Sequence, residues 1–138
     1  IGAGQRCLEL ACQRVEDRET FGKKLSQHQS IRENIAKSYA ELEMARLLVH
    51  KTCWHIDHHG VKPSIELISA TKISVPLVIQ SIIDRCMQMH GAGGLTEDWC
   101  MAEQFNYARW CRQADGPDEV HQMALGKRII QQYAEASN

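Results

Sequence analysis

The sequence contains few residues that interrupt a helix. Only three prolines and nine glycines occur among its 138 residues, and most of them lie close together between long stretches that contain neither. Proline removes a backbone donor and glycine destabilises a helix by about 1 kcal/mol, so their scarcity favours long helices with short connections. No segment alternates apolar and polar residues over the length of a strand, apart from an ambiguous stretch at 73–75. We therefore expect an all-α chain.

Other absences exclude whole classes of protein. The net charge is −1, so the chain lacks the basic surplus that a general nucleic-acid binder needs. No apolar run approaches the length of a membrane span and no secretory signal opens the chain, so association with a membrane is not indicated. None of the six cysteines belongs to a CxxC pair. In their helical settings we expect them to be reduced, partly buried thiols.

The length of the chain suits one domain with a sizeable core and is too short for two. The chain does not begin with Met, and its first residues, IGAGQ, already resemble the inside of a helix. We expect residues 1–138 to be a single domain of a longer protein, whose other part could carry any targeting signal.

Apolar residues recur every three or four positions along most of the chain, which is typical of helices with one buried face. Ser26 and Thr96 are expected to cap the second and fourth helices, and Pro117 to open the last. The third helix is apolar nearly all round, so it should be central or shared with a partner chain. The architecture predicted is an antiparallel up-and-down helical bundle. Its expected helices cover approximately 1–17, 27–59, 64–90, 97–112 and 117 onward.

The segment 114–122, ADGPDEVHQ, gathers three carboxylates around one Gly-Pro step where the last helix should begin. Asp115 could cap that helix and stabilise its positive end. It could also point into a cleft and act as a general base, since a carboxylate at a helix N-terminus tends to stay ionised. The spacing alone does not separate these two interpretations.

Three further features are ambiguous by themselves. Arg18, beside Phe21 in the break between the first two helices, could hold a phosphate with its planar guanidinium or simply cap the first helix. The turn at 91–94, GAGG, follows no strand and lacks the spacing of a Rossmann phosphate loop, so alone it indicates a helix end. His55 and His59 lie one helical turn apart, but a solvated helix end explains them better than a metal site, and no metal is expected.

Together these motifs resemble the C-terminal helical domain of the acyl-CoA dehydrogenases. Four landmarks occur in the family's order: an Arg-x-x-Phe-Gly turn at 18–22, a His-Gln pair at 28–29, a Gln-x-x-Gly-x-x-Gly turn at 88–94, and an acidic-Gly step at 115–116. Each is weak alone, but the four together cover nearly the whole chain and are fairly specific. The sequence DGPDE at 115–119 is most similar to the branch of the family that is sometimes fused to a kinase-like domain.

The resemblance implies a flavoprotein in which a helical domain and a small β-domain precede this bundle. It also implies homodimers or homotetramers with FAD across the subunit interface. Asp115 would be a base first and a cap second, removing the pro-R α-proton of an acyl-CoA, with Gly116 beside the thioester. Arg18 would contact the pyrophosphate of a neighbour's FAD. The other residues that the resemblance places at FAD are Phe21, Gln29, Gln88, Met89, His90, Gly91 and Ala92 for the neighbour's cofactor, and Pro117, Asp118 and Glu119 for the chain's own.

The implied reaction is a step of fatty acid β-oxidation. A hydride would leave the β-carbon for flavin N5, and electron-transfer flavoprotein or oxygen would be the final acceptor. In a eukaryote the protein would be mitochondrial or peroxisomal, and otherwise cytoplasmic. The alternative is a non-catalytic helical module that assembles oligomers, which the apolar third helix motivates. In either case we expect the isolated chain to form oligomers without dehydrogenase activity.

Three positions depart from the family's pattern. Asp115 stands where most members have Glu, and its side chain is roughly an ångström shorter, which is enough to alter rate or substrate choice. Pro117 replaces the usual Thr, removing a hydroxyl and a backbone donor to flavin. Asn106 and Tyr107 replace an upstream Arg-Asp pair. These departures leave the FAD role better supported than the identity of the substrate.

Overall fold

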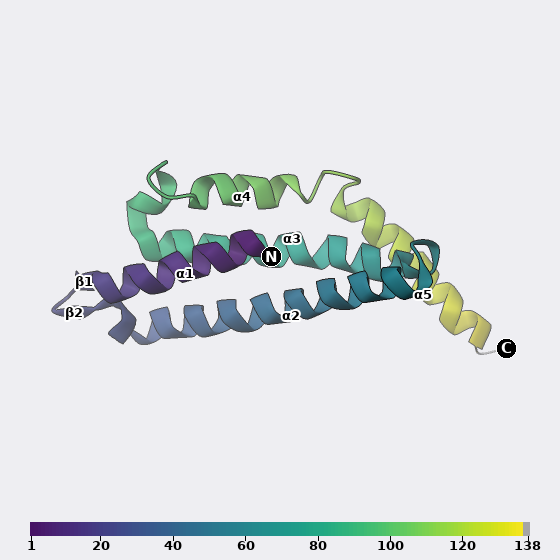
Figure 1. The fold of residues 1–138 in the computed structure, drawn as a ribbon, viewed down its shortest axis with the longest axis horizontal. Coiled ribbons are helices and arrows are strands. Elements are labelled where there is room, and N and C mark those ends of the chain that lie inside the picture. The colour runs from purple at the N-terminus through teal and green to yellow at the C-terminus, as the bar shows by residue number, and fades with distance from the viewer. Residues whose placement is uncertain (137–138) are drawn as a thin grey trace.

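The computed structural model describes residues 1–136, and five α-helices account for most of them. In Figure 1 the first four helices lie alongside one another and reverse direction at each connection, whereas the last leaves the bundle at an angle toward the C-terminus. The expected all-α, antiparallel up-and-down bundle is confirmed. The helices are α1 (Gly2–Asp17), α2 (Gln29–His59), α3 (Ile65–His90), α4 (Met101–Trp110) and α5 (Asp118–Ala136).

A small hairpin, which the sequence did not predict, connects α1 to α2. Its strands β1 (Glu19–Thr20) and β2 (Lys23–Lys24) pair antiparallel. The two residues between them, Phe21 and Gly22, have φ values of 54° and 78°, and positive φ at both positions is what a tight two-residue hairpin turn requires. Strands of this length are too short to show an alternating pattern. The 3-10 turn η1 (Leu25–Gln27) follows the hairpin in the same connection, and the next two connections contain the 3-10 turns η2 (Lys62–Ser64) and η3 (Gly91–Leu95).

Both expected hydroxyl caps are wrong. Ser26 lies inside η1, and the N-cap residue of α2 is His28, which makes no side-chain capping bond. The Thr96 hydroxyl donates back to the Gly93 carbonyl oxygen at 2.8 Å and so closes η3. Consequently α4 begins only at Met101, several residues later than the sequence predicts.

The helix α3 is the centre of the bundle, as its apolar composition predicts. It packs against α1, α2, α4 and α5. Ile82 and Ile83 are both fully buried although they are consecutive and therefore face different sides of the helix. At Gly4 of α1 a Cβ would lie 2.9 Å from Ile79 Cδ1, so the absence of a side chain there lets α1 approach α3 closely. The apolar core consists of Cys7, Leu8, Ala11, Val15, Leu42, Ala45, Val75, Ile79, Ile82, Ile83, Cys86, Met89, Met101 and Ala108.

Two apolar regions differ from expectation. The stretch 62–95, which contains α3, is long and apolar enough to cross a membrane by length and composition, although the sequence analysis recognised no such run. The core helix of a bundle can meet the same criterion, and α3 packs against four other helices, but only 17% of its most apolar window is buried within the single chain. In α5, by contrast, the apolar positions lie largely outside the core: Met123 is 72% exposed and Ile130 is 71% exposed.

Candidate functional site

Asp115 and Gly116 form the tip of the turn between α4 and α5. Both have positive φ, 55° and 101°. Glycine adopts this region freely, and Asp is one of the few other residues that tolerates it. The α5 helix begins at Asp118, so Asp115 lies too far upstream to be its N-cap residue. The Asp115 side chain is exposed, and within residues 1–136 its carboxylate has no hydrogen bond or ion pair.

The two ends of this turn are tied to each other and to α3. Arg112 Nε donates to Asp118 Oδ2 at 2.7 Å, and Arg112 Nη1 donates to Gln80 Oε1 at 3.2 Å. The Asp118 amide also donates to the Arg112 carbonyl oxygen at 3.2 Å. The Asp118 carboxylate is almost completely buried, and its second oxygen, Oδ1, has no partner in the described part of the chain. Asp118, which the resemblance places at FAD, therefore also closes the turn through its bonds to Arg112.

A lysine holds the end of α4. Lys72 Nζ of α3 donates to the Cys111 carbonyl oxygen at 2.6 Å. A cation at the C-terminal carbonyls of a helix interacts favourably with the helix dipole. Sequence reasoning missed Lys72, Arg112 and Gln80, because their partners are distant along the chain. The only local signal is the opposite charges of Arg112 and Asp118 on either side of the turn.

The end of α3 and the turn that follows it contain five of the predicted cofactor residues. Gln88, Gly91 and Ala92 are exposed, whereas Met89 and His90 are buried. His90 is only 5% exposed; its Nδ1 donates to the Cys86 carbonyl oxygen at 2.9 Å and its Nε2 is buried without a partner among residues 1–136. Burial lowers the pKa of His90. Only the exposed part of this segment is open to a ligand in the isolated chain.

Trp99 and Gly94 shape the same turn. The Trp99 ring meets the His90 ring edge-on, with centroids 4.7 Å apart. At Gly94 a Cβ would lie 2.7 Å from the Met87 carbonyl oxygen, closer than a Cβ atom comes to a neighbouring heavy atom in real proteins. The glycine is therefore required by the close approach of η3 to the end of α3.

The hairpin end contains Arg18, Phe21 and Gln29. Arg18 is the C-cap residue of α1, and no carboxylate of the described residues lies within ion-pair distance of its exposed guanidinium. Phe21 is 97% exposed at the hairpin tip. Gln29 is exposed and donates to Glu33 Oε1 at 2.7 Å. This end presents a cation and an aromatic ring that the chain itself leaves uncovered.

The chain does not bring the predicted site residues into one place. In Figure 1 the hairpin and η3 lie toward one end of the bundle, and the α4–α5 turn lies beyond the opposite end of α4. The Lys72 contact fixes the α4–α5 turn beside the first half of α3, whereas His90 ends that helix. The stretch 72–90 is about 27 Å long at roughly 1.5 Å per residue. Two groups result: an open end with Arg18, Phe21, Gln29 and 88–92, and a braced turn with 115–119.

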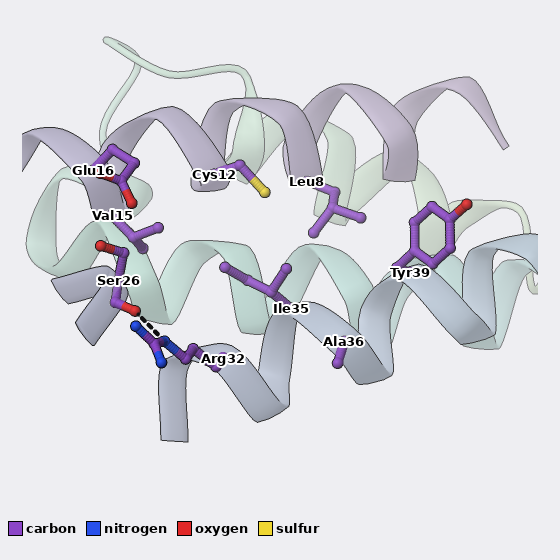
Figure 2. Close-up of a pocket in the computed structure, with 9 residues that line it drawn as sticks. All are labelled: Leu8, Cys12, Val15, Glu16, Ser26, Arg32, Ile35, Ala36 and Tyr39. Carbon is purple, nitrogen blue, oxygen red and sulfur yellow. Dashed lines mark hydrogen bonds between the residues drawn. The ribbon is translucent and has the colours of Figure 1, made fainter. Parts of the chain in front are cut away.

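A groove between α1 and α2 is separate from both groups. It has a volume of about 500 Å³. Figure 2 shows apolar side chains of α1, including Leu8 and Cys12, facing Ile35 of α2, with the hydrogen bond from Arg32 to the Ser26 carbonyl oxygen at one end and Tyr39 at the other. No residue that the sequence predicts at FAD or substrate lines this groove.

His55, His59 and the buried cysteines Cys7 and Cys86 lie outside the predicted site. His55 Nδ1 is 2.8 Å from Ser64 Oγ, and the His55 and His59 rings are 4.5 Å apart between centroids. Among residues 1–136 no three His, Cys, Asp or Glu side chains are placed to hold a metal ion. All six cysteines are free. Burial raises the pKa of Cys86 and of Cys7 to about 12, so both remain thiols at neutral pH.

Comparison with known proteins decides the family. The family model described as "Acyl-CoA dehydrogenase, C-terminal domain" matches residues 1–130. The chain belongs to the acyl-CoA dehydrogenase family. The resemblance that the four landmarks indicate is thereby confirmed, and the matched residues include both groups of predicted site residues.

Curated relatives of this acyl-CoA dehydrogenase domain are considerably longer than it is. The chain is 41% identical over 127 residues to acyl-CoA dehydrogenase family member 11 of Gallus gallus, covering 92% of the chain and 16% of that protein. It is 39% identical over 127 residues to the probable acyl-CoA dehydrogenase FadE2 of Mycobacterium tuberculosis, covering 92% of the chain and 31% of that protein. The chain thus spans less than a third of either relative.

Solved structures show the same fold. A putative acyl-CoA dehydrogenase from Mycobacterium abscessus superposes with a TM-score of 0.93 at 37% identity, covering 96% of this chain and 32% of that one. A glutaryl-CoA dehydrogenase from Mycobacterium smegmatis in complex with FADH2 superposes with a TM-score of 0.87 at 28% identity, covering 93% of this chain and 33% of that one. The latter carries a reduced flavin.

Proposed function

We propose that this domain is the C-terminal part of an FAD-dependent dehydrogenase that introduces an α,β double bond into acyl-CoA thioesters, with Asp115 as the α-proton base. The observation that carries the proposal is the state of Asp115. At the position of the family's acidic-Gly step, the chain holds an exposed carboxylate without a partner among residues 1–136 on a turn that Arg112 and Asp118 close.

The proposed reaction requires that the thioester carbonyl be polarised and that a carboxylate remove the α-proton. The α-proton of a thioester is weakly acidic, so backbone donors must polarise the thioester carbonyl before a carboxylate can remove that proton. Asp115 would take the proton as the α C–H bond breaks, and Gly116 would let the thioester approach the main chain closely. Bound FAD would supply the acceptor for the hydride that leaves the β-carbon.

The residues fit FAD only when two chains are considered. Arg18 offers an unpaired guanidinium, which suits a diphosphate, and Phe21 offers an uncovered ring. The open end and the braced turn are separated by about 27 Å of α3. We therefore infer that each FAD lies between the open end of one subunit and the braced turn of another, in a homodimer or homotetramer.

A second function is favoured by one observation. Met44, Leu47, Met123 and Ile130 all expose more than half of their surface in the single chain. Apolar side chains in such number on α2 and α5 suit burial against other subunits or domains. A non-catalytic oligomerisation module would use the same surfaces. A measurement of the oligomeric state therefore cannot distinguish the two functions, whereas a measurement of flavin reduction can.

The experiment uses the full-length protein encoded by the gene. It is mixed anaerobically with a panel of acyl-CoAs, and the loss of oxidised-flavin absorbance is followed for wild type, Asp115→Asn and Asp115→Glu. We expect rapid bleaching in wild type, a loss of at least about a thousandfold in Asp115→Asn, and retained bleaching in Asp115→Glu, which restores the family's usual carboxylate.

Two results would decide against the proposal. Equal bleaching in wild type and Asp115→Asn would place the base elsewhere. No bleaching with any acyl-CoA would favour the oligomerisation module. Reoxidation of the bleached enzyme by oxygen or by electron-transfer flavoprotein would identify the acceptor, and the mitochondrial, peroxisomal or cytoplasmic location stays a prediction.

A further inference from the structure

His121, in the first turns of α5, contacts both residues of the acidic-Gly step. Its Nε2 lies 3.2 Å from the Asp115 carbonyl oxygen. At Gly116 a Cβ would lie 3.2 Å from His121 Nε2 and 3.5 Å from its Cδ2. The imidazole ring therefore packs on the side of Gly116 where a Cβ would lie, while its Nε2 holds the main chain of Asp115.

The other side of the ring is anchored in the bundle. His121 Nδ1 is 3.4 Å from Ser69 Oγ, and Ser69 belongs to α3 and is only 5% exposed. A carbonyl oxygen can only accept, so Nε2 donates to Asp115, and in that tautomer Nδ1 accepts from the Ser69 hydroxyl. A directed chain of hydrogen bonds thus runs from the buried α3 through the imidazole to the Asp115 carbonyl.

This support is needed because of the conformation of Asp115. A non-glycine residue at φ 55° is disfavoured by about 1 kcal/mol or more relative to the right-handed region. The Arg112–Asp118 pair closes the two ends of the turn but does not reach Asp115 itself. The Asp115 main chain and side chain share one Cα, so the orientation of the main chain sets the direction of the Cα–Cβ bond from which the carboxylate extends.

We propose that His121 is a positioning residue for Asp115: it sets the direction of the base by holding the Asp115 carbonyl against the Ser69 anchor. This inference rests on the proposed role of Asp115 as the base. His121 does not touch the reacting atoms, so its effect should pass entirely through the carboxylate.

The test is a series of variants in the full-length FAD-loaded protein. His121→Leu removes both hydrogen bonds, and the rate of flavin reduction at saturating acyl-CoA should fall about ten- to a hundredfold, as expected for a small misplacement of a catalytic group. The dissociation constant of the acyl-CoA should change less than about twofold, because binding is not altered. His121→Gln, whose side-chain amide can still donate, should retain the rate to within about threefold.

Two further variants separate positioning from folding. Gln131→Leu makes a similar change at an exposed site farther along α5 and should leave the rate unchanged. Ser69→Ala removes only the anchor and should slow reduction severalfold, so it provides a test even if His121→Leu does not retain FAD. In an Asp115→Asn background, His121→Leu should slow the residual rate less than about twofold, since a residue that acts through the carboxylate loses its effect when the carboxylate is gone.

The outcomes distinguish the inference from the proposed function. If wild type bleaches, Asp115→Asn does not, and both His121→Leu and Ser69→Ala keep the wild-type rate, only the role of His121 is overturned. An additional large loss from His121→Leu in the Asp115→Asn background would also overturn it and indicate a structural role. Wild type that fails to bleach, or Asp115→Asn that bleaches normally, would overturn both.

Discussion

The open end and the braced turn contain the two halves of the predicted site, and they are built differently. At the open end Arg18 and Phe21 project without a partner among the described residues. At the braced turn, Arg112 and Asp118 form an ion pair that is itself bonded to α3. One half thus lacks contacts from within the described chain, and the other is organised by contacts that the chain itself supplies.

This difference suggests a division of roles. A group that performs chemistry must be held within a fraction of an ångström, which calls for contacts inside one subunit. A group that grips the far part of a large cofactor can be ordered by the cofactor and the neighbouring subunit. Each change described below affects one half of the site and leaves the other intact. The changes are given in order of decreasing expected effect.

The largest effect is expected at the ion pair of the braced turn. Asp118→Ala leaves Arg112 partly buried without its counter-ion, which should lower the free energy of unfolding of the domain by about 3 kcal/mol. The shift of the urea unfolding midpoint measures this. Glu119→Ala removes the adjacent exposed carboxylate and should change stability by less than about 0.5 kcal/mol. Equal effects of the two variants would mean that the ion pair does not brace the turn.

The next effect is expected at the turn after α3. Gly94→Ala places a methyl group 2.7 Å from the Met87 carbonyl oxygen, and backbone cannot move aside as a side chain can. We expect a loss of about 2 kcal/mol. Gly93→Ala is the matched control, because its Cβ would meet only Trp99 Nε1 at 3.6 Å, an ordinary contact. Melting temperatures of the two variants should therefore diverge; similar values would contradict the close approach.

A smaller effect, confined to the cofactor, is expected at the open end. Arg18→Gln should leave the melting temperature unchanged, because the guanidinium is exposed and unpaired in the described structure. It should weaken FAD binding about tenfold, the contribution of one charge-assisted hydrogen bond. Titration of the apoprotein with FAD, followed by quenching of flavin fluorescence, measures this. Lys23→Gln, which removes a charge from the same hairpin, should bind FAD like wild type if the guanidinium itself matters.

The smallest effect is expected in the pH dependence of stability. Burial lowers the pKa of His90 below its ordinary value of 6.5, so the unfolded chain binds a proton at higher pH than the folded one. Stability therefore rises with pH between the folded pKa and 6.5, and is lost as the pH falls through that window. His90→Asn can still donate to the Cys86 carbonyl and should show a shallower fall in melting temperature between pH 8 and pH 5. Parallel curves would exclude this contribution.

The sequence predicts the long helices better than their ends. The expected third helix, 64–90, differs from α3 by only one residue. The long apolar segment made its extent easy to recognise in the sequence. The start of α4 and the hairpin were not predicted. Thr96 bonds back to Gly93 instead of capping a helix, and the hairpin strands contain two residues each. Periodicity identifies which side of α5 is apolar but not what covers it, and Met123 and Ile130 are largely exposed in the single chain.

The candidate site was located by its motifs but not explained by them. Asp115 and Gly116 stand out in the sequence because a Gly-Pro step marks a turn there and three carboxylates surround it. The contacts that hold them join Lys72 to Cys111 and Ser69 to His121, across many intervening residues. No local pattern encodes such pairs, since they depend on how α3, α4 and α5 meet.

The left-handed backbone at Asp115 has a consequence for the proposed reaction. Within the fold itself φ at Asp115 and Gly116 is positive, and the Asp115 carbonyl accepts a hydrogen bond from His121. The conformational entropy of this loop is therefore lost once, when the protein folds, and not again with each substrate molecule. Every acyl-CoA that arrives would meet the same geometry, so the rate of proton removal would depend on the substrate's own positioning and not on a search by the loop.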